Sequence, residues 1–331
     1  MHQYHAPFWL PGGNAQTLWA ATLAKRHLGP PIDYRRERWT APDGDFIDVD
    51  WLVATPADAN RGKQVLLVLF HGLEGNSRSQ YAEAFAAYAR DQGMAYAVAH
   101  FRGCSGELNL APRAYHSGDF AEIDWILRRF RSAHAGPVVA VGISMGGNAL
   151  LRWAQEQGQA ANAVLSAVAA VCSPLDLAAG GHAISRGFNR QVYTRLFLRS
   201  MKPKAMRKLR QFPGLFDAEA MHAVRDLFGF DNVFTAPLHG FKNTQDYWQR
   251  ASAKPHLRSL RVPALVLNAR NDPFIPPASL PKAQDAGPWV TLWQPQQGGH
   301  VGFPHGAYPA QVRSMPQHVG DWLRQHAQAQ P

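Results

Sequence analysis

The sequence predicts an α/β fold: a mostly parallel, doubly wound sheet with helices on both faces and one inserted helical cap. Short apolar runs, typical of buried strands, alternate with amphipathic stretches that have the spacing of helices. This alternation stops after Pro174 and returns at Val262, with a helical segment punctuated by glycine and proline between them. The chain has 331 residues, 46% of them hydrophobic, which is enough for one large core.

The interruption divides the chain into three predicted parts. We expect residues 1–33 to form an N-terminal extension that packs on the core. The α/β core comprises two segments, 34–173 and 256–331, because the strand–helix alternation falls within them. Residues 174–255 then form a helical, basic cap between two strands of the sheet.

The first two predicted strands form a hairpin. Residues 45–53 alternate polar and apolar side chains, the pattern of a strand with one exposed face. Residues 35–39 are expected to pair with them across the turn at Pro42-Asp43-Gly44.

The next elements alternate strand and helix. Residues 65–70 are continuously apolar, as in a strand buried on both faces, and residues 95–100 are the next strand. Residues 78–92 have helical spacing, and Gly93 is suited to ending that helix. Residues 119–130 form an amphipathic helix that Asp119 caps or starts.

The remaining core elements continue this alternation. Apolar runs predict buried strands at residues 138–141 and 164–172. After the insertion, strands are expected at 262–268 and 289–293. A closing helix is predicted over residues 311–325.

The segment Gly142-Ile143-Ser144-Met145-Gly146 reads G-x-S-x-G. It lies between a predicted buried strand and a predicted helix, the context of a nucleophile elbow. Small residues on both sides of Ser144 permit a strained turn that exposes its hydroxyl. The pattern therefore indicates Ser144 as a catalytic nucleophile.

A serine nucleophile needs a base and a group that orients this base, and both are expected after later strands of the sheet. Asp272 follows the strand at 262–268, and His300 follows the last strand. The order Ser…Asp…His favours these two residues as acid and base. Asp176 is the rival acid, although capping the first cap helix is the simpler role for it, and His305 is the rival base.

An oxyanion formed at Ser144 needs preorganised hydrogen-bond donors. We expect the backbone N–H of Met145 to be one donor, because it directly follows the nucleophile. The loop after the strand at 65–70 begins His71-Gly72-Leu73, and the N–H of Leu73 is the second expected donor. The side chain of His71 is interpreted as a structural support for this loop.

Eight segments together resemble the α/β-hydrolase superfamily, and more narrowly its YheT-like branch, the family-4 α/β-hydrolases. They are FWLPGGNAQTL at 8–18, HGLEG at 71–75, FRGCSGE at 101–107, AYHSG at 114–118, GISMGGN at 142–148, GFKNTQDYW at 240–248, NDP at 271–273 and GGH at 298–300. The resemblance implies a triad of Ser144, Asp272 and His300. It also implies hydrolysis of carboxylic esters, as in carboxylesterases and in acylglycerol or phospholipid lipases.

Ser144 is then expected to pass through an acyl-enzyme, on an ester with a short- to medium-length chain or on a lipid. Two alternatives remain open. Thioester cleavage, amide cleavage or acyl transfer would use the same residues, and a non-catalytic member would bind a ligand without turning it over. No motif predicts a cofactor or a metal, since His2 and His5 do not form a metal site without further ligands.

The positive charge is concentrated in one segment. Residues 177–216 contain no Asp or Glu. Removing their nine basic residues from the 34 in the chain leaves 25 against 24 acidic ones. The segment is either a solvated face of an exposed insertion or a cationic surface that binds anionic lipid, phosphate or an acidic partner. Binding to anionic lipid would make the contact with the membrane peripheral. Nucleic acid is not expected, because no binding motif accompanies the charge.

The cellular location is expected to be cytoplasmic. The first residues lack the basic start and apolar stretch of a signal peptide, and no apolar run is long enough to span a membrane. The two cysteines, Cys104 and Cys172, are interpreted as buried reduced thiols. Oligomeric state is not predicted.

Overall fold

Eight strands form one sheet in the computed structural model, which describes residues 4–53 and 63–328. The strands lie in the order β1-β2-β4-β3-β5-β6-β7-β8. β1 pairs antiparallel with β2, β2 pairs antiparallel with β4, and all other neighbours are parallel. This sheet confirms the predicted α/β fold. The bounds are β1 Tyr34–Thr40, β2 Phe46–Leu52, β3 Leu66–Phe70, β4 Ala95–Ala99, β5 Val138–Ile143, β6 Ala167–Val171, β7 Ala264–Leu267 and β8 Val290–Trp293.

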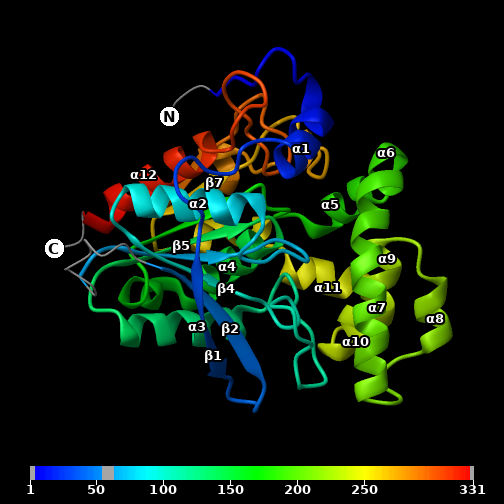
Figure 1. Cartoon of the computed structure of the whole chain (residues 1–331). Coiled ribbons are helices and arrows are strands. Elements are labelled where there is room, and N and C mark those ends of the chain that lie inside the picture. Colours follow the sequence, from blue (N-terminus) through cyan, green and yellow to red (C-terminus); the bar gives the residue numbers. More distant parts are fainter. Residues whose placement is uncertain (1–3, 54–62, 329–331) are drawn as a thin grey trace.

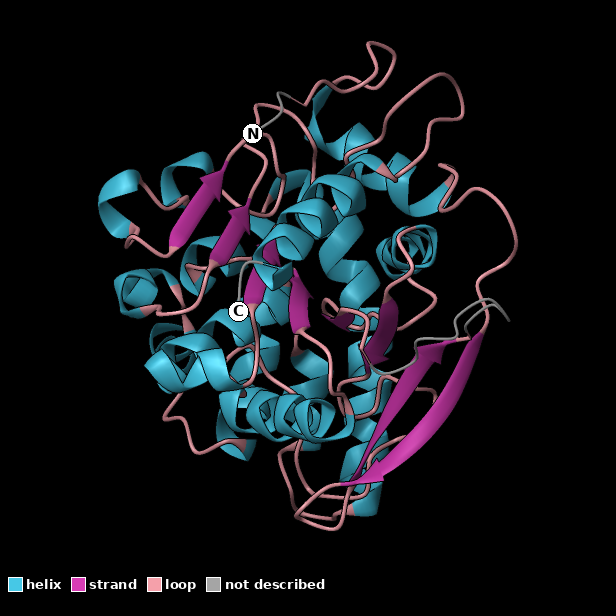
Figure 2. Cartoon of the chain, turned by 90° about the vertical axis from the view of Figure 1, so that its left-hand side faces the viewer, coloured by secondary structure: helices cyan, strands magenta, loops and turns pink. Residues whose placement is uncertain are grey.

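The long β1–β2 hairpin forms one edge of the sheet (Figure 2). The centre is the parallel pair β3 and β5, whose residues are all buried because both faces are covered by helices. Their register pairs Phe70 with Gly142, so both strands end at the same level. The loop after β3 therefore lies beside the turn after β5.

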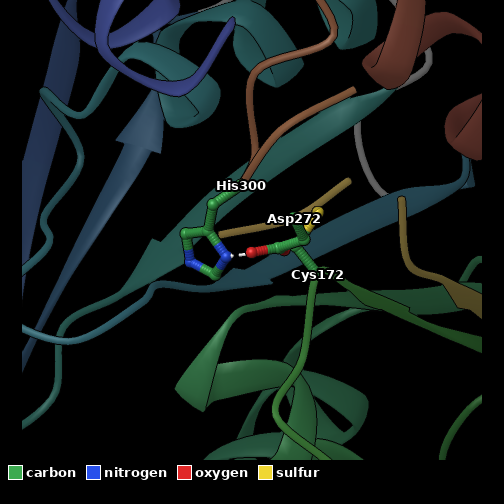
Figure 3. Close-up of side chains that lie close together, drawn as sticks. All are labelled: Cys172, Asp272 and His300. Atoms are coloured by element: carbon green, nitrogen blue, oxygen red, sulfur yellow. Dashed lines mark hydrogen bonds and ion pairs between the residues drawn. The ribbon is translucent and has the colours of Figure 1, made fainter. Parts of the chain in front are cut away.

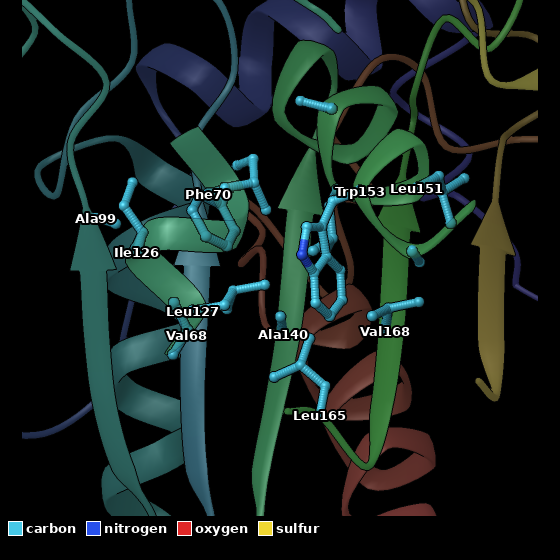
Figure 4. Close-up of a cluster of buried hydrophobic side chains, with 14 of the residues drawn as sticks. Val68, Phe70, Ala99, Ile126, Leu127, Ala140, Leu151, Trp153, Leu165 and Val168 are labelled. Carbon is cyan, nitrogen blue, oxygen red and sulfur yellow. The ribbon is translucent and has the colours of Figure 1, made fainter. Parts of the chain in front are cut away.

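Helices cover both faces of the sheet. Helices α2 (Gln80–Asp91) and α12 (Ser314–Gln328) pack on one face. Helices α3 (Phe120–Ala133) and α4 (Met145–Gln157) pack on the other, where Trp153 lies among side chains of the strands (Figure 4). The indole N–H of this buried Trp donates to Oδ1 of Asp124 at 2.9 Å, so its polar atom is satisfied inside the core.

A group of helices separates β6 from β7, as the sequence predicts, and lies to one side of the sheet (Figure 1). Segments α6, η2 and α7 follow one another without a break, and their middle part, like η3, has π-helical hydrogen bonding. The bounds are α5 Leu177–Ile184, α6 Gly187–Asn189, η2 Arg190–Thr194, α7 Arg195–Gln211, α8 Ala218–Ala223, α9 Leu227–Phe230, η3 Asp231–Thr235, α10 Ala236–Leu238 and α11 Thr244–Ala251.

The remaining helices are short or lie outside the sheet layers. Helix α1 spans Gly12–Thr22, and the 3-10 segments are η1 Gly158–Ala163, η4 Lys254–Ser259, η5 Pro277–Ser279 and η6 Ala283–Asp285. Within residues 4–53 and 63–328, no helix has the length and hydropathy to cross a membrane.

Three local expectations differ from the structure. Helix α12 begins at Ser314 rather than at Gln311, because Gln311 forms β-bridges with Lys25 and His305 and so is not part of a helix. Strand β6 is shorter than predicted, since the preceding residues form η1 and a turn. Strand β2 is buried over residues 46–50 rather than exposed on one face, because Asp48 and Asp50 pair with Arg38 and Arg36 of β1. Asp119 starts α3, one of its two predicted roles, and makes no capping hydrogen bond because its carboxylate pairs with Arg113.

Candidate active site

Ser144 occupies a sharp turn between β5 and α4. Its backbone has φ 52° and ψ −119°, a conformation that is strained for any residue with a Cβ. The turn is tight, because a Cβ on Gly142 would lie 2.5 Å from the carbonyl oxygen of Gly146. Only glycine fits there, so the G-x-S-x-G pattern follows from the space available.

The structure brings Ser144, His300 and Asp272 together. Nε2 of His300 lies 3.0 Å from Oγ of Ser144, and Nδ1 lies 2.9 Å from Oδ2 of Asp272. The Asp272 side chain is fully buried, and its other oxygen accepts the N–H of Phe274 at 2.8 Å. Because the ionised carboxylate can only accept, Nδ1 carries the proton toward Asp272 and Nε2 is left to accept from the serine.

The two rival residues lie elsewhere. The carboxylate of Asp176 accepts the N–H of Ala179 at 3.0 Å and so caps α5, in agreement with the simpler of its two predicted roles. His305 forms an isolated antiparallel β-bridge with Gln311, with which it exchanges backbone hydrogen bonds. Neither residue lines the cavity that contains Ser144.

The expected oxyanion donors, Leu73 and Met145, lie beside Ser144. A Cβ on Gly72 would come within 3.3 Å of the Ser144 Cβ, so this loop runs directly past the serine. Leu73 and Met145 both line the same cavity as Ser144 and His300. Met145 is the first residue of α4, so its N–H has no acceptor within the helix and is available to a ligand.

His71 supports this loop, as predicted from the sequence. Its Nε2 accepts the N–H of Phe101 at 3.0 Å, which leaves Nδ1 to donate to the carbonyl of Gly72 at 2.8 Å. Burial, followed by the neighbouring His100, lowers the pKa of His71 to about 3. The imidazole is therefore neutral with a fixed tautomer, and it holds Gly72 in place without facing the cavity.

Cys172 lies next to Asp272 and His300 (Figure 3). Its Sγ accepts the N–H of Val301 at 3.2 Å, and burial, followed by the charge of Asp272, raises the pKa of its thiol. Side-chain atoms of Cys172, Asp272 and His300 lie within 4.8 Å of one another, a spacing that also suits a metal ion. A metal would need a thiolate, however, and both nitrogens of His300 already have hydrogen-bond partners, so the group fits a hydrogen-bonded unit better.

The cavity above Ser144 has a volume of about 160 Å³ and is mostly apolar. Helices between β6 and β7 form its roof. Its apolar lining from these helices includes Phe197, Met201, Phe230, Phe234 and Trp248. Such a cavity suits the apolar part of a small ligand, held against the serine.

Sequence reasoning missed two contacts at this site. Lys204 of α7 forms an ion pair with Glu74, the residue after Leu73. Gln16 and Thr17 of α1 accept hydrogen bonds from the backbone just before and at His300. The motif at residues 8–18 contains both residues, but a motif does not reveal which distant loop its side chains contact.

Comparison with known proteins identifies the family. Residues 65–307 match the model of the α/β hydrolase fold family. The chain belongs to this family. YheT of Escherichia coli (strain K12), whose name describes an esterase, is 36% identical over 297 residues, covering 88% of this chain and 85% of YheT. This similarity confirms the YheT-like branch.

More distant relatives agree with this assignment. A mouse protein named phospholipase ABHD3 is 28% identical over 318 residues, covering 94% of this chain and 76% of that protein. The solved structure of mouse alpha/beta hydrolase domain-containing protein 10 superposes with a TM-score of 0.54 at 14% identity, covering 88% of this chain and 99% of that one. At this identity the superposition supports the fold alone.

Proposed function

We propose that this chain hydrolyses carboxylic esters with Ser144 as nucleophile, His300 as base and Asp272 as the group that orients the base. The observation that carries the proposal is the chain of hydrogen bonds from Asp272 through His300 to Ser144, at 2.9 and 3.0 Å, on the floor of an apolar cavity. An apolar cavity can hold an acyl chain while its carbonyl lies against the serine.

Catalysis then proceeds in two halves. Oγ of Ser144 attacks the ester carbonyl as His300 takes its proton, and the N–H groups of Leu73 and Met145 stabilise the oxyanion. His300 returns the proton to the leaving alcohol, which gives an acyl-enzyme. A water molecule that loses its proton to His300 attacks this intermediate, and the free acid departs as Ser144 regains its proton.

Names of relatives support esters over other acyl substrates. Besides the esterase and the phospholipase, a yeast relative is named monoacylglycerol lipase and is 26% identical over 278 residues. Thioester cleavage, amide cleavage and acyl transfer use the same three residues. Adding an alcohol distinguishes transfer from hydrolysis, because a transferase partitions the acyl group to the alcohol.

The test of the serine mechanism is Ser144→Ala measured on p-nitrophenyl butyrate. We expect turnover to fall by roughly 10⁶-fold, as in other serine hydrolases that lose the nucleophile. Ser132→Ala, on α3, is the matched control and should keep wild-type activity. A fluorophosphonate probe should label the wild-type chain and not Ser144→Ala. Full activity of Ser144→Ala would overturn the proposal, and absence of labelling and turnover in the wild type would favour the non-catalytic alternative.

We further propose that the cap takes its substrate from an anionic membrane surface on the cytoplasmic side. Three of the nine basic residues in the 177–216 segment are used inside the molecule: Lys202 and Lys208 donate to backbone carbonyls and Lys204 pairs with Glu74. Within the described part of the chain, that pair is the only ion pair the nine form. The other six are exposed arginines, namely Arg186, Arg190, Arg195, Arg199, Arg207 and Arg210.

Two exposed apolar side chains accompany these arginines. Phe188 is 52% exposed and Leu196 is 61% exposed, both on the continuous α6–η2–α7 helix. Arginines mixed with large apolar residues are typical of helices that lie in the interface of an anionic bilayer. On the same helix, Phe197 and Met201 line the cavity, so a lipid bound at the outer side would be one helix away from Ser144.

Vesicle sedimentation tests this contact. Binding to vesicles of phosphatidylglycerol mixed with phosphatidylcholine should exceed binding to pure phosphatidylcholine, and should weaken from low to physiological salt. Arg195→Gln/Arg199→Gln should reduce binding, whereas Arg258→Gln/Arg270→Gln, on another exposed part of the chain, should not. Equal binding to neutral and anionic vesicles would contradict the contact without affecting the proposed ester hydrolysis.

A further inference from the structure

The motif at residues 8–18 packs against the two loops that carry the acid and the base of the site. It includes the start of α1, in blue beside the orange loops in Figure 1. A Cβ on Gly13 would lie 1.8 Å from the carbonyl oxygen of Asn271, and a Cβ on Gly299 would lie 2.7 Å from that of Gly13. The backbones are therefore in direct contact at Gly13 and Gly299, where there is no room for a side chain.

Gln16 joins the two loops through a single oxygen. Its side chain is fully buried, and Oε1 accepts from Nδ2 of Asn271 and from the N–H of Gly298, both at 2.9 Å. Nε2 of Gln16 donates to the carbonyl of Leu10 at 2.9 Å, which fixes the orientation of the amide. Asn271 directly precedes Asp272, and Gly298 stands two residues before His300, so this oxygen links the side chain that neighbours Asp272 to the backbone of the loop that leads into His300.

Thr17 holds the backbone of the base itself. Its Oγ1 accepts the N–H of His300 at 2.8 Å and donates its own proton to the carbonyl of Gly13 at 2.7 Å. A hydroxyl has one proton, so the bond to Gly13 turns a lone pair toward His300. A third hydrogen bond joins the two loops directly, since Oδ1 of Asn271 accepts the N–H of Gly299 at 3.0 Å.

We propose that Gln16 and Thr17 are positioning residues that set the geometry of His300. The inference rests on the proposed function, in which His300 must contact Ser144 and Asp272 at the same time. Gly298 and Gly299 have φ values of 147° and 63°, which favour glycine, and glycine permits many other backbone conformations when it is not held. Hydrogen bonds from the loop to Gln16 and Thr17 of α1 restrict that freedom. Neither Gln16 nor Thr17 lines the cavity, so they act through His300 and not on the substrate.

Thr17→Val tests the proposal, because valine keeps the shape of threonine and removes only the hydroxyl that accepts from His300 and donates to Gly13. We expect kcat on p-nitrophenyl butyrate, per active site titrated with a fluorophosphonate, to fall roughly ten-fold, with KM changed less than about two-fold. The acidic limb of the pH profile of kcat/KM should shift, since it reports the ionisation of His300. Thr17→Ser, which restores the oxygen, should recover most of the loss.

Thr22→Val is the matched control, because Thr22 lies on the same helix, is exposed and donates only to the carbonyl of Leu18. It should behave as wild type. Gln16→Met is a second test with the same expected pattern, and it decides the question if Thr17→Val does not fold. A folded variant with wild-type kcat per titrated site and an unshifted pH profile would overturn the proposal, as would an equal loss in Thr22→Val. Activity in Ser144→Ala would instead overturn the proposed function.

Discussion

Lys204 and Glu74 form an ion pair of 2.8 Å that joins α7 to the loop containing Leu73. Glu74 has a positive φ of 58°. The hydroxyl of Tyr115 forms hydrogen bonds with both its backbone N–H and its carboxylate. The Tyr115 hydroxyl accepts the N–H of Glu74 at 3.1 Å and donates to its carboxylate at 2.8 Å. The position of the Leu73 N–H therefore depends on a side chain of the helix that roofs the cavity.

Breaking this ion pair should weaken catalysis without unfolding the chain. We expect Lys204→Met and Glu74→Gln each to lower kcat/KM by roughly five-fold, because the Leu73 N–H loses its fixed position. The double variant should lose little more than either single one, with a coupling of about 1 kcal/mol. Lys202→Met is the control on the same helix, since its ammonium donates to the carbonyls of His222 and Val224 instead. Strictly additive losses would show that the pair does not act as a unit.

His116 should make stability depend on pH. Burial, followed by the charge of Arg113, lowers the pKa of His116 to about 3, and its ring lies 4.4 Å from that of His239 at the end of α10. The unfolded chain binds a proton near the ordinary value of 6.5, whereas the folded chain stays neutral. The contribution of His116 is therefore complete above pH 6.5 and is lost as pH falls toward 3.

Urea unfolding of His116→Gln and wild type at pH 7, 6 and 5 measures this effect. Between pH 7 and pH 5 the wild type should lose about 2 kcal/mol more unfolding free energy than the variant. Other titrating groups, such as Asp231, whose pKa burial raises to about 6, are present in both proteins and cancel in the difference. Equal losses in the two proteins would mean that His116 is protonated in the folded chain.

The two thiols should not react in the folded protein. Cys172 is fully buried and Cys104 is 8% exposed, and burial raises the pKa of Cys104 to about 12. Thiolate is the reactive form, so Ellman's reagent should modify neither residue under native conditions and should leave esterase activity unchanged. The same sample in guanidinium should yield both thiols. Rapid native labelling together with loss of activity would contradict this picture.

Sequence patterns located the candidate triad because parallel strands end at one edge of a sheet. Ser144, Asp272 and His300 each follow such a strand, so their order along the chain was enough to place them together. The contacts of α1 with these loops could not be predicted from the sequence, because the hydrogen bond from Gly298 to Gln16 joins residues 282 positions apart. No periodicity or local motif specifies which distant backbone a buried amide will bind.

The sequence also does not specify which basic residues of the cap face solvent. The count of basic residues predicted a cationic segment, and the exposed arginines just before α6 and in η2 and α7 agree with it. Lys208, from the same count, is 2% exposed and donates to the carbonyls of Asn109 and Ala111 at 2.6 and 3.0 Å. Which cations face solvent depends on the side of the helix that packs on the core, and this became visible only in the fold.

Met201 should limit the length of the acyl chain. It lines the cavity from α7 and packs with apolar side chains of the cap, so a larger residue there takes space from the ligand. For Met201→Trp we expect kcat/KM on p-nitrophenyl octanoate to fall roughly ten-fold relative to the acetate, since each excluded methylene forfeits about 0.8 kcal/mol of burial. Leu196→Trp is the matched control, because Leu196 is 61% exposed on the outer side of the same helix. It should leave the ratio of octanoate to acetate unchanged. Equal changes for both esters in Met201→Trp would place the acyl chain in a different part of the cavity.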